Sequence, residues 1–389
     1  MERRRIVVVM GTRPEAIKLA PVVHELRSRS DALDTLVVAT AQHREMLDQV
    51  LALFQIRPDY DLNLMQYDQS LSDLTARLLH ALDQTLKRLR PDLLLVQGDT
   101  TTVFTAALAA FYNKIAVGHV EAGLRSDDRY NPFPEEINRR VTTALTEFHF
   151  APTPLAKRRL LREGVPAERI VVTGNTVVDA LSRILQGAFD LSTTPLGKLP
   201  LDNHRLLFVT SHRRESWGEA LENICLALAE IVSAFPDVII VYPVHPNPNV
   251  RSTVESLLSH KERIYLFDPF DYLTTLNLIQ RSYLVLTDSG GIQEEAPTLN
   301  KPVLVLRQTT ERPEACMAGL AKLVGTSRQA IVTETARLLT NPSAYRAMTN
   351  GANPFGDGRA SARIVDALER WARGKQPLLV SEAQFCPAA

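Results

Sequence analysis

The sequence predicts an α/β protein with two domains, each built on a parallel β-sheet that helices cover on both faces. The first observation is length, because 389 residues exceed what one ordinary hydrophobic core contains. The second is that short apolar runs alternate with segments of helical periodicity, which is typical of buried parallel strands. The third is a turn-rich stretch at residues 187–203, after which the alternation begins again.

The predicted strands of the first domain are six apolar runs, at residues 6–10, 36–40, 93–97, 116–120, 148–151 and 170–173. Helical segments such as R-E-M-L-D-Q-V-L-A-L-F lie between them. We place the first domain at residues 1–172, and we expect a C-terminal amphipathic helix at about 362–378 to join it.

The predicted strands of the second domain, residues 173–361, lie at 206–210, 238–242, 264–267, 283–287 and 303–306. Two such domains facing each other would enclose a cleft. Ligands of open parallel sheets bind at the carboxyl ends of strands. We therefore expect functional residues directly after the strand runs.

Composition limits the kinds of partner and the compartment that we expect for this protein. Lys plus Arg equals Asp plus Glu, at 44 each, so charge gives no reason to expect nucleic acid or an anionic membrane as a partner. No segment approaches the ~20 apolar residues of a membrane span. The three cysteines are widely separated and show neither a disulfide framework nor a zinc spacing. These features predict a protein of the reducing cytoplasm.

The stretch T-D-S-G-G-I-Q-E-E-A at residues 287–296 predicts a glycine turn between a strand and a helix. Gly290 and Gly291 would let a ligand approach the main chain beside Ser289, and N–H groups at a helix start favour phosphate. Glu294 or Glu295, one turn into the helix, would accept hydrogen bonds from two ribose hydroxyls. A nucleotide satisfies both halves of the motif. An ordinary strand-to-helix turn also explains the glycines.

Two further basic sites follow predicted strands. G-T-R-P-E-A-I-K at 11–18 brings Arg13 and Lys18 to a helix start, yet it matches neither the dinucleotide fingerprint nor the P-loop. T-T-E-R-P-E at 309–314 contains Arg312. An isolated arginine is usually a surface residue, but three basic sites at strand ends favour anion binding.

Carboxylates follow strands or begin a helix at three places. They are Asp99 in Q-G-D-T-T-T, Glu121 in G-H-V-E-A-G-L-R and Glu135 in P-F-P-E-E-I-N-R. Asp99 has a second interpretation as the N-cap of the next helix. Glu135 is also explained by the helix macrodipole, which favours acidic residues in a first turn.

Histidines occupy similar positions, namely His43, His212 and His245, each just beyond a predicted strand. One such histidine alone is more often structural than catalytic. No His/Cys metal-ligand spacing and no nucleophile elbow appear in the sequence, so we expect no metal site. What remains is a set of carboxylates, imidazoles and anion-binding turns.

These motifs together resemble the non-hydrolysing UDP-N-acetylglucosamine 2-epimerases. The resemblance runs in order from about residue 6 to about residue 370, through G-T-R-P-E-A-I-K, A-Q-H-R-E-M-L-D, G-D-T-T-T, G-H-V-E-A-G-L-R, P-E-E-I-N-R, H-R-R-E-S, Y-P-V-H-P-N-P-N, T-D-S-G-G-I-Q-E-E-A-P and T-T-E-R-P-E. It implies a glycosyltransferase-B-like fold, with UDP in the interdomain cleft and a C-terminal helix that crosses back to the first domain.

The resemblance also implies residue roles. The catalytic positions are matched by Asp99, Glu121, Glu135 and His212. The substrate-binding positions are matched by Arg13, Lys18, Ser289, Gly290, Gly291, Glu295 and Arg312. Motifs that hold a second, allosteric UDP-N-acetylglucosamine in some members contain Gln42, His43, Arg213 and His245.

The chain departs from the family pattern at four positions, which are Gln97 for a common histidine, Ser211 for a smaller residue, Thr275 for a phenylalanine near the uracil, and Gln308 for an aspartate. None of them is a proposed catalytic group. Stacking on the base would need another side chain, such as Phe270 or Leu276.

The activity that the resemblance implies is the interconversion of UDP-N-acetylglucosamine and UDP-N-acetylmannosamine for cell-surface polysaccharides, without a cofactor and by a homodimer. The alternatives are a UDP-sugar transferase of the same architecture, a hydrolysing 2-epimerase and a non-catalytic nucleotide-sugar sensor. The sequence does not distinguish which carboxylate is the base and which is the acid.

Overall fold

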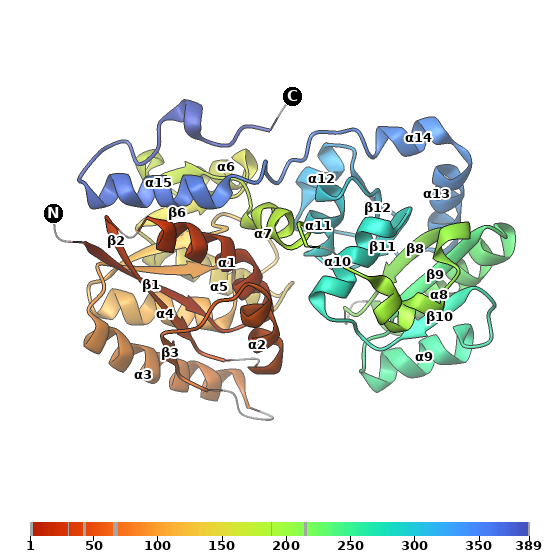
Figure 1. Ribbon diagram of the computed structural model, residues 1–389, viewed down its shortest axis with the longest axis horizontal. Coiled ribbons are helices and arrows are strands. Elements are labelled where there is room, and N and C mark those ends of the chain that lie inside the picture. The colour runs from red at the N-terminus through yellow and green to blue at the C-terminus, as the bar shows by residue number, and fades with distance from the viewer. Residues whose placement is uncertain are drawn as a thin grey trace. The chain divides into compact units, whose positions relative to one another are not determined.

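The computed structural model describes residues 3–29, 31–41, 44–64, 69–187, 189–213 and 216–387. The chain divides into two compact units (Figure 1). The first contains the residues up to Ile184 together with Phe355–Pro387, and the second contains Leu185–Pro354. Both are parallel α/β units, which confirms the predicted fold class.

The first unit is built on a parallel sheet which, within the described residues, has seven strands in the order β3-β2-β1-β4-β5-β6-β7. They are β1 Arg4–Met10, β2 Leu33–Ala39, β3 Tyr60–Asp61, β4 Leu93–Gln97, β5 Ala116–Val120, β6 Phe148–Ala151 and β7 Ile170–Val172. The strand order reverses between β1 and β4. Loops that leave neighbouring strands diverge at such a point, and ligands bind there in open α/β sheets.

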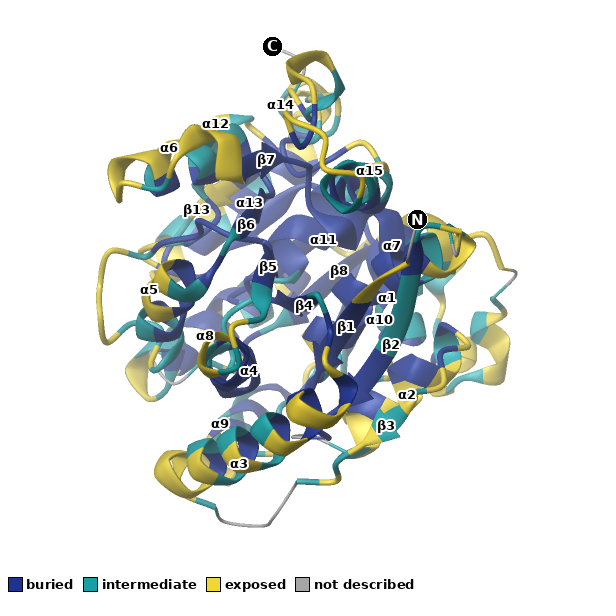
Figure 2. Ribbon diagram, turned by 90° about the vertical axis from the view of Figure 1, so that its left-hand side faces the viewer, coloured by how far each residue is buried: buried dark blue, intermediate teal, exposed yellow. Residues whose placement is uncertain are grey.

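The helices of this unit are α1 Arg13–Ser28, α2 Arg44–Leu53, α3 Leu71–Leu89, α4 Thr101–Tyr112, α5 Glu135–Leu145, α6 Pro154–Arg162, α7 Thr176–Ile184 and α15 Ala360–Ala372. Short 3₁₀ turns lie at Ala167–Arg169 and Ser381–Ala383. In α3 the buried side chains Leu74, Leu78 and Leu82 recur every four residues, so one face packs against the sheet core. Figure 2 shows β1 and β4 as largely buried.

The C-terminal segment belongs to the first unit, as expected. The carboxylate of Asp179 in α7 accepts hydrogen bonds from the main-chain N–H groups of Ala360 (3.2 Å) and Ser361 (2.8 Å) at the start of α15. Arg29 at the end of α1 is ion-paired with Asp366 of α15. The division at Ile184 differs from the expected boundary at 172/173, because α7 packs on α1 and α15.

The second unit repeats the architecture with the strand order β10-β9-β8-β11-β12-β13 among the residues described. The strands are β8 Arg205–Thr210, β9 Val238–Pro243, β10 Ile264–Phe267, β11 Leu284–Thr287, β12 Val303–Val305 and β13 Ala321–Leu323. The helices are α8 Glu219–Ala234, α9 Pro248–Leu258, α10 Tyr272–Arg281, α11 Ile292–Thr298, α12 Pro313–Met317, α13 Arg328–Thr340 and α14 Pro342–Ala347. Short 3₁₀ turns lie at Leu191–Thr193, Pro195–Lys198 and Leu201–Asn203. Here the order reverses between β8 and β11.

No helix in the described part of the chain is both long and apolar enough to cross a lipid bilayer.

Candidate functional site

Asp99 lies just past the end of β4, after Gly98, whose φ of 85° is a conformation that favours glycine. Helix α5 holds this turn. Arg139 donates to the Oδ2 atom of Asp99 from Nε (2.9 Å) and Nη2 (2.6 Å), and the Asn138 side chain donates to the Asp99 carbonyl (2.9 Å). The N-cap of α4 is Thr100. The interpretation of Asp99 as a helix cap is therefore wrong, and its side chain is paired across the sheet end instead.

Glu121 follows β5 and has a φ of 68°, which is uncommon for a non-glycine residue. Its side chain is buried among donors. Lys18 Nζ lies 2.6 Å from Oε1, Asn175 Nδ2 lies 3.3 Å from the same atom, and the Gln97 side chain donates to Oε2. Lys18, expected at a substrate-binding position, thus contacts an expected catalytic carboxylate. Asn175 was not predicted.

The two glutamates of P-F-P-E-E differ in environment. Glu135 is the first residue of α5 and is half-buried. Glu136 is fully buried and accepts from the Ser126 N–H (2.9 Å), Arg140 (3.0 Å) and Arg139 (3.2 Å). Burial opposes ionisation, but these donors hold the pKa of Glu136 below its usual value. Glu136 is therefore a structural anchor of the loop before α5.

Glu15 is a buried carboxylate that sequence reasoning left unassigned. It accepts from the N–H groups of Gly11 (2.5 Å) and Thr12 (2.9 Å) and from the Thr100 hydroxyl. Burial raises the pKa of Glu15 to about 7 against the effect of these donors. It ties the turn after β1 to the turn that carries Asp99. The capping-box spacing T-R-P-E was its signal in the sequence. Arg13 begins α1 nearby in the chain and is half-buried.

In the second unit, Asp288 organises the loop after β8. Its Oδ2 atom accepts from the N–H groups of His212 (2.8 Å) and Arg213 (2.9 Å) and from the Ser211 hydroxyl (3.1 Å). Its Oδ1 atom lies 3.2 Å from Nδ1 of His212. Asp288 is fully buried. It lies inside T-D-S-G-G, yet its partners are far away in sequence, and no role was predicted for it.

His212 and His245 meet at the ends of β8 and β9. Their rings are stacked, with centroids 6.1 Å apart and an interplanar angle of 16°. The N–H of Asn247 donates to Nδ1 of His245 (3.2 Å), so the other nitrogen of that ring carries its proton when the ring is neutral. Gln42 and His43, expected at a second nucleotide-sugar site, lie outside the described residues.

The predicted phosphate turn, Ser289 to Gly291, lies between β11 and α11. A β-carbon built at Gly290 would lie 3.7 Å from Nη2 of Arg213 and 3.7 Å from Cζ of Arg312. Two guanidinium groups thus flank Gly290, which has no side chain. Glu294 pairs with Arg312 through Nε (2.8 Å).

Glu295 is also buried and accepts a hydrogen bond from the Tyr272 hydroxyl (2.9 Å). Of the two side chains suggested for base stacking, Leu276 is fully buried in the core and is excluded. Phe270 is half-buried and lies 5.2 Å from Phe267, measured between ring centroids. Thr275 is half-buried and its hydroxyl donates to the Asp271 carbonyl at the start of its own helix.

A buried glutamate stabilises the arginines around the phosphate turn. Glu311 pairs with Arg307 (2.7 Å) and lies 3.5 Å from Arg213. Although burial opposes ionisation, Arg312, Arg307 and Arg213 lower the pKa of Glu311 to about 2. The carboxylate therefore stays charged at neutral pH and fixes the side chains that would face an anion.

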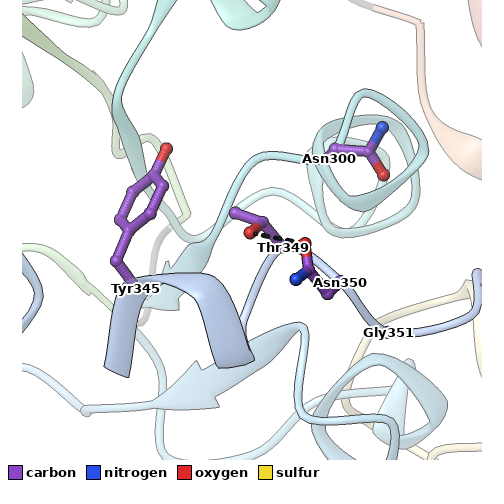
Figure 3. Close-up of a pocket in the computed structure, with 5 residues that line it drawn as sticks. All are labelled: Asn300, Tyr345, Thr349, Asn350 and Gly351. Carbon is purple, nitrogen blue, oxygen red and sulfur yellow. Dashed lines mark hydrogen bonds between the residues drawn. The ribbon is translucent and has the colours of Figure 1, made fainter. Parts of the chain in front are cut away.

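A surface hollow of about 570 Å³ lies elsewhere in the second unit, beside α14 (Figure 3). It is lined by Asn300, Tyr345, Thr349, Asn350 and Gly351. None of the predicted site residues lines it, and it is open and polar, so we assign it no role. Among the described residues, no group of three or more His, Cys, Asp or Glu side chains is arranged to hold a metal ion.

Comparisons with known proteins identify the family of the chain. The model of the UDP-N-acetylglucosamine 2-epimerase family matches residues 24–369. UDP-N-acetylglucosamine 2-epimerases of Yersinia pestis and Escherichia coli K12 are 53% and 51% identical to the chain over 370 residues, which is 94% of the chain and 98% of each relative.

Solved structures give the same result. A UDP-GlcNAc 2-epimerase from Neisseria meningitidis, bound to UDP-GlcNAc, has a TM-score of 0.87 at 49% identity and covers 94% of this chain and 99% of its own. The enzyme from Methanocaldococcus jannaschii, in complex with UDP-GlcNAc and UDP, has a TM-score of 0.78 at 34% identity with the same coverage. The resemblance inferred from the motifs is confirmed, and the chain belongs to the UDP-N-acetylglucosamine 2-epimerase family.

Proposed function

We propose that the chain interconverts UDP-N-acetylglucosamine and UDP-N-acetylmannosamine and releases no free sugar. The observation that carries the proposal is that Asp99 and Glu121 follow the adjacent strands β4 and β5 and that each carboxylate is ion-paired with a cation from a helix. Together with Glu135 they supply several acidic groups, as inversion at one carbon requires.

The order of bond breaking follows from the acidity of the substrate. C2 of the sugar carries an acetamido nitrogen and is not next to a carbonyl carbon, so its proton is far too weakly acidic for a carboxylate of ordinary pKa. We propose that the C1–O bond breaks first and that its electron pair leaves with UDP. The positive charge at C1 then acidifies the C2–H bond. A carboxylate takes the proton, and the C–H electron pair forms the C1=C2 double bond of 2-acetamidoglucal.

The return step re-forms the two bonds that were broken. A proton is delivered to the opposite face of C2, and the diphosphate oxygen of UDP re-forms the bond to C1. The product has inverted configuration at C2, and no oxidant or reductant is consumed. Two proton sites on opposite faces account for the need for more than one carboxylate.

The second unit is assigned to UDP. The turn from Ser289 to Gly291, through the N–H groups of Gly290 and Gly291, would stabilise the diphosphate together with Arg213 and Arg312 as negative charge develops on it. Glu295, oriented by Tyr272, would accept hydrogen bonds from the ribose hydroxyls. Phe270 is the candidate platform for the uracil.

His212 is assigned to the leaving group. Its Nδ1 atom lies 3.2 Å from the buried carboxylate of Asp288, which would orient the ring. A protonated imidazole would neutralise charge on the departing diphosphate. Arg13 and Lys18 remain proposed ligand-binding positions, with Lys18 acting at least through its contact with Glu121.

Deuterium incorporation tests the proposed function. In heavy water with UDP-N-acetylglucosamine and no acceptor, the enzyme should place deuterium at C2 and form UDP-N-acetylmannosamine. A transferase or a sensor would leave C2 unlabelled, and a hydrolysing enzyme would accumulate free N-acetylmannosamine and UDP. Asp99→Asn or Glu121→Gln should lower turnover at least 100-fold while UDP affinity stays within about twofold. Full activity of either variant would remove that residue from the mechanism.

We also propose that the enzyme is a cytoplasmic homodimer serving polysaccharide synthesis, and that His43, Gln42, Arg213 and His245 contribute to a second UDP-N-acetylglucosamine site. Light scattering of the purified chain tests the dimer. Sigmoidal dependence of the initial rate on UDP-N-acetylglucosamine, lost on His245→Ala, would support the second site, and hyperbolic kinetics in the wild type would exclude it.

A further inference from the structure

Both oxygens of the Glu121 carboxylate are occupied by donors from different elements of the first unit. Lys18 reaches Oε1 from α1 and Asn175 reaches it from the loop before α7, while Gln97 at the end of β4 reaches Oε2. The side chain of Glu121 is only 5% exposed. The surroundings also keep its main chain at a positive φ.

The donors around Glu121, which are Lys18, Gln97 and Asn175, form a cluster that suits an ionised carboxylate and not a protonated one. An ammonium group has no acceptor, and the amide nitrogens of Gln97 and Asn175 are donors only. A proton on either oxygen of Glu121 would face a donor and break one of these hydrogen bonds. Bonds between such donors and a charged acceptor are the strong ones, so the cluster opposes protonation of Glu121.

Asp99 is held differently. Both bonds from Arg139 go to its Oδ2 atom, and its side chain is 26% exposed. Glu135 is half-buried at the first turn of α5. The side chain of Asp99 thus remains more accessible than that of Glu121 for exchanging a proton with a substrate carbon, and Glu135 is half-buried, with its Oε2 atom buried.

We propose that Glu121 acts as a fixed negative charge that stabilises the cationic C1 carbon when UDP leaves, and that Gln97 and Asn175 are the positioning residues that keep it so. The inference rests on the proposed function. It assigns the two proton transfers at C2 to the carboxylates outside the cluster, Asp99 and Glu135.

The groups around Glu121 make this testable through pH. Lys18 is its charged partner, whereas Gln97 and Asn175 do not titrate. Asp99 and His119 lie at the same strand ends, and burial lowers the pKa of His119 to about 4, so this histidine is neutral near pH 7. Loss of one neutral donor should make Glu121 easier to protonate.

The test compares pH profiles of kcat/KM for the wild type, Gln97→Met and Asn175→Asp. Gln97→Met keeps the shape and loses the donor. Asn175→Asp keeps the oxygen that accepts from the Val177 N–H (3.1 Å) but places a second carboxylate against Glu121. In each variant kcat/KM should begin to fall at a pH about one unit higher than in the wild type, because Glu121 is protonated more easily. The shift should be larger in Asn175→Asp. In both variants activity should recover as the pH is raised.

Two controls separate this effect from a general loss of structure. Gln97→His retains a nitrogen donor, so near neutral pH it should keep most of the activity that Gln97→Met loses. Asn113→Leu removes an amide that donates to Asp83 (2.8 Å) at the other end of α4, and its profile should match the wild type. Circular dichroism and melting temperature establish that each variant is folded, and either donor variant suffices for the test.

The outcomes are distinct. If Glu121 is the base, removing a donor strengthens it, and C2 deuterium exchange should become faster; that result would overturn the inference. An unshifted acidic limb in a folded variant would also overturn it. Failure of the wild type to exchange deuterium at C2 would instead contradict the proposed function itself.

Discussion

Two buried histidines and one buried glutamate predict opposite contributions to stability in acid. His119 on β5 lies opposite His149 on β6, and both side chains are 1% exposed. Burial lowers the pKa of His119 from 6.5 to about 4 and that of His149 to about 3. Below pH 6.5 the unfolded chain therefore binds protons that the folded chain rejects, and stability is lost as pH falls.

The magnitude follows from linkage. With a pKa of 6.5 unfolded and about 4 folded, lowering the pH from 7 to 5 costs about 2 kcal/mol of unfolding free energy for His119. Glu15 acts in the other direction, since its pKa is raised from 4.5 to about 7. Its folded form binds the additional proton, and the same change of pH stabilises the fold by about 2 kcal/mol.

Variants separate the two contributions. His119→Gln keeps a nitrogen donor for the Gly98 carbonyl, which His119 Nε2 contacts at 2.7 Å. Between pH 7 and pH 5 it should lose about 2 kcal/mol less stability than the wild type, whereas Glu15→Gln should lose about 2 kcal/mol more. His80→Gln on the exposed face of α3 should behave as the wild type does.

Urea unfolding at the two pH values measures these differences. The chain has two tryptophans, and Trp371 packs edge-on against Phe148 of β6, with ring centroids 5.6 Å apart. In a Trp217→Phe background its fluorescence reports the first unit alone. If His119→Gln and Glu15→Gln showed the pH dependence of the wild type, the assigned protonation states would be wrong.

Two further predictions concern turns at strand ends. Asp288→Asn cannot accept all the donors from the loop after β8, so UDP affinity should fall by 10- to 100-fold in isothermal titration calorimetry; unchanged affinity would show that this loop does not hold the nucleotide. Gly11→Ala would place a methyl group onto the Thr40 hydroxyl and should lower the free energy of unfolding by about 1–3 kcal/mol. An unaltered melting temperature would contradict that packing argument.

The strands could largely be predicted because runs such as V-V-V and L-L-L-V are buried on both faces and carry their own signal. β3 and β13 could not. β3 is two residues long and β13 is three, both lie at sheet edges, and their exposed residues give no apolar run. The expected boundary at 172/173 differs from the division at Ile184 because α7 packs on α1 and α15, which are far from it in the sequence.

In the candidate site, too, local features could be predicted and contacts between distant residues could not. Candidate carboxylates such as Glu121 were found from their position after strands, which is a local property. Their partners were not, because Arg139 lies 40 residues from Asp99 and Asn175 lies 54 residues from Glu121. Helix capping was a reasonable interpretation of Asp99 from neighbouring residues alone. Only the folded sheet end shows that Thr100 takes that position.

The return of α15 to the first unit has a consequence for biosynthesis. The helix that Asp179 anchors is translated after the entire second unit. On the ribosome, the part of the apolar surface of the first unit that α15 covers stays exposed while the second unit is synthesised and folds. A nonsense mutation before residue 360 would therefore damage the amino-terminal half of the molecule, although its own codons were all read correctly.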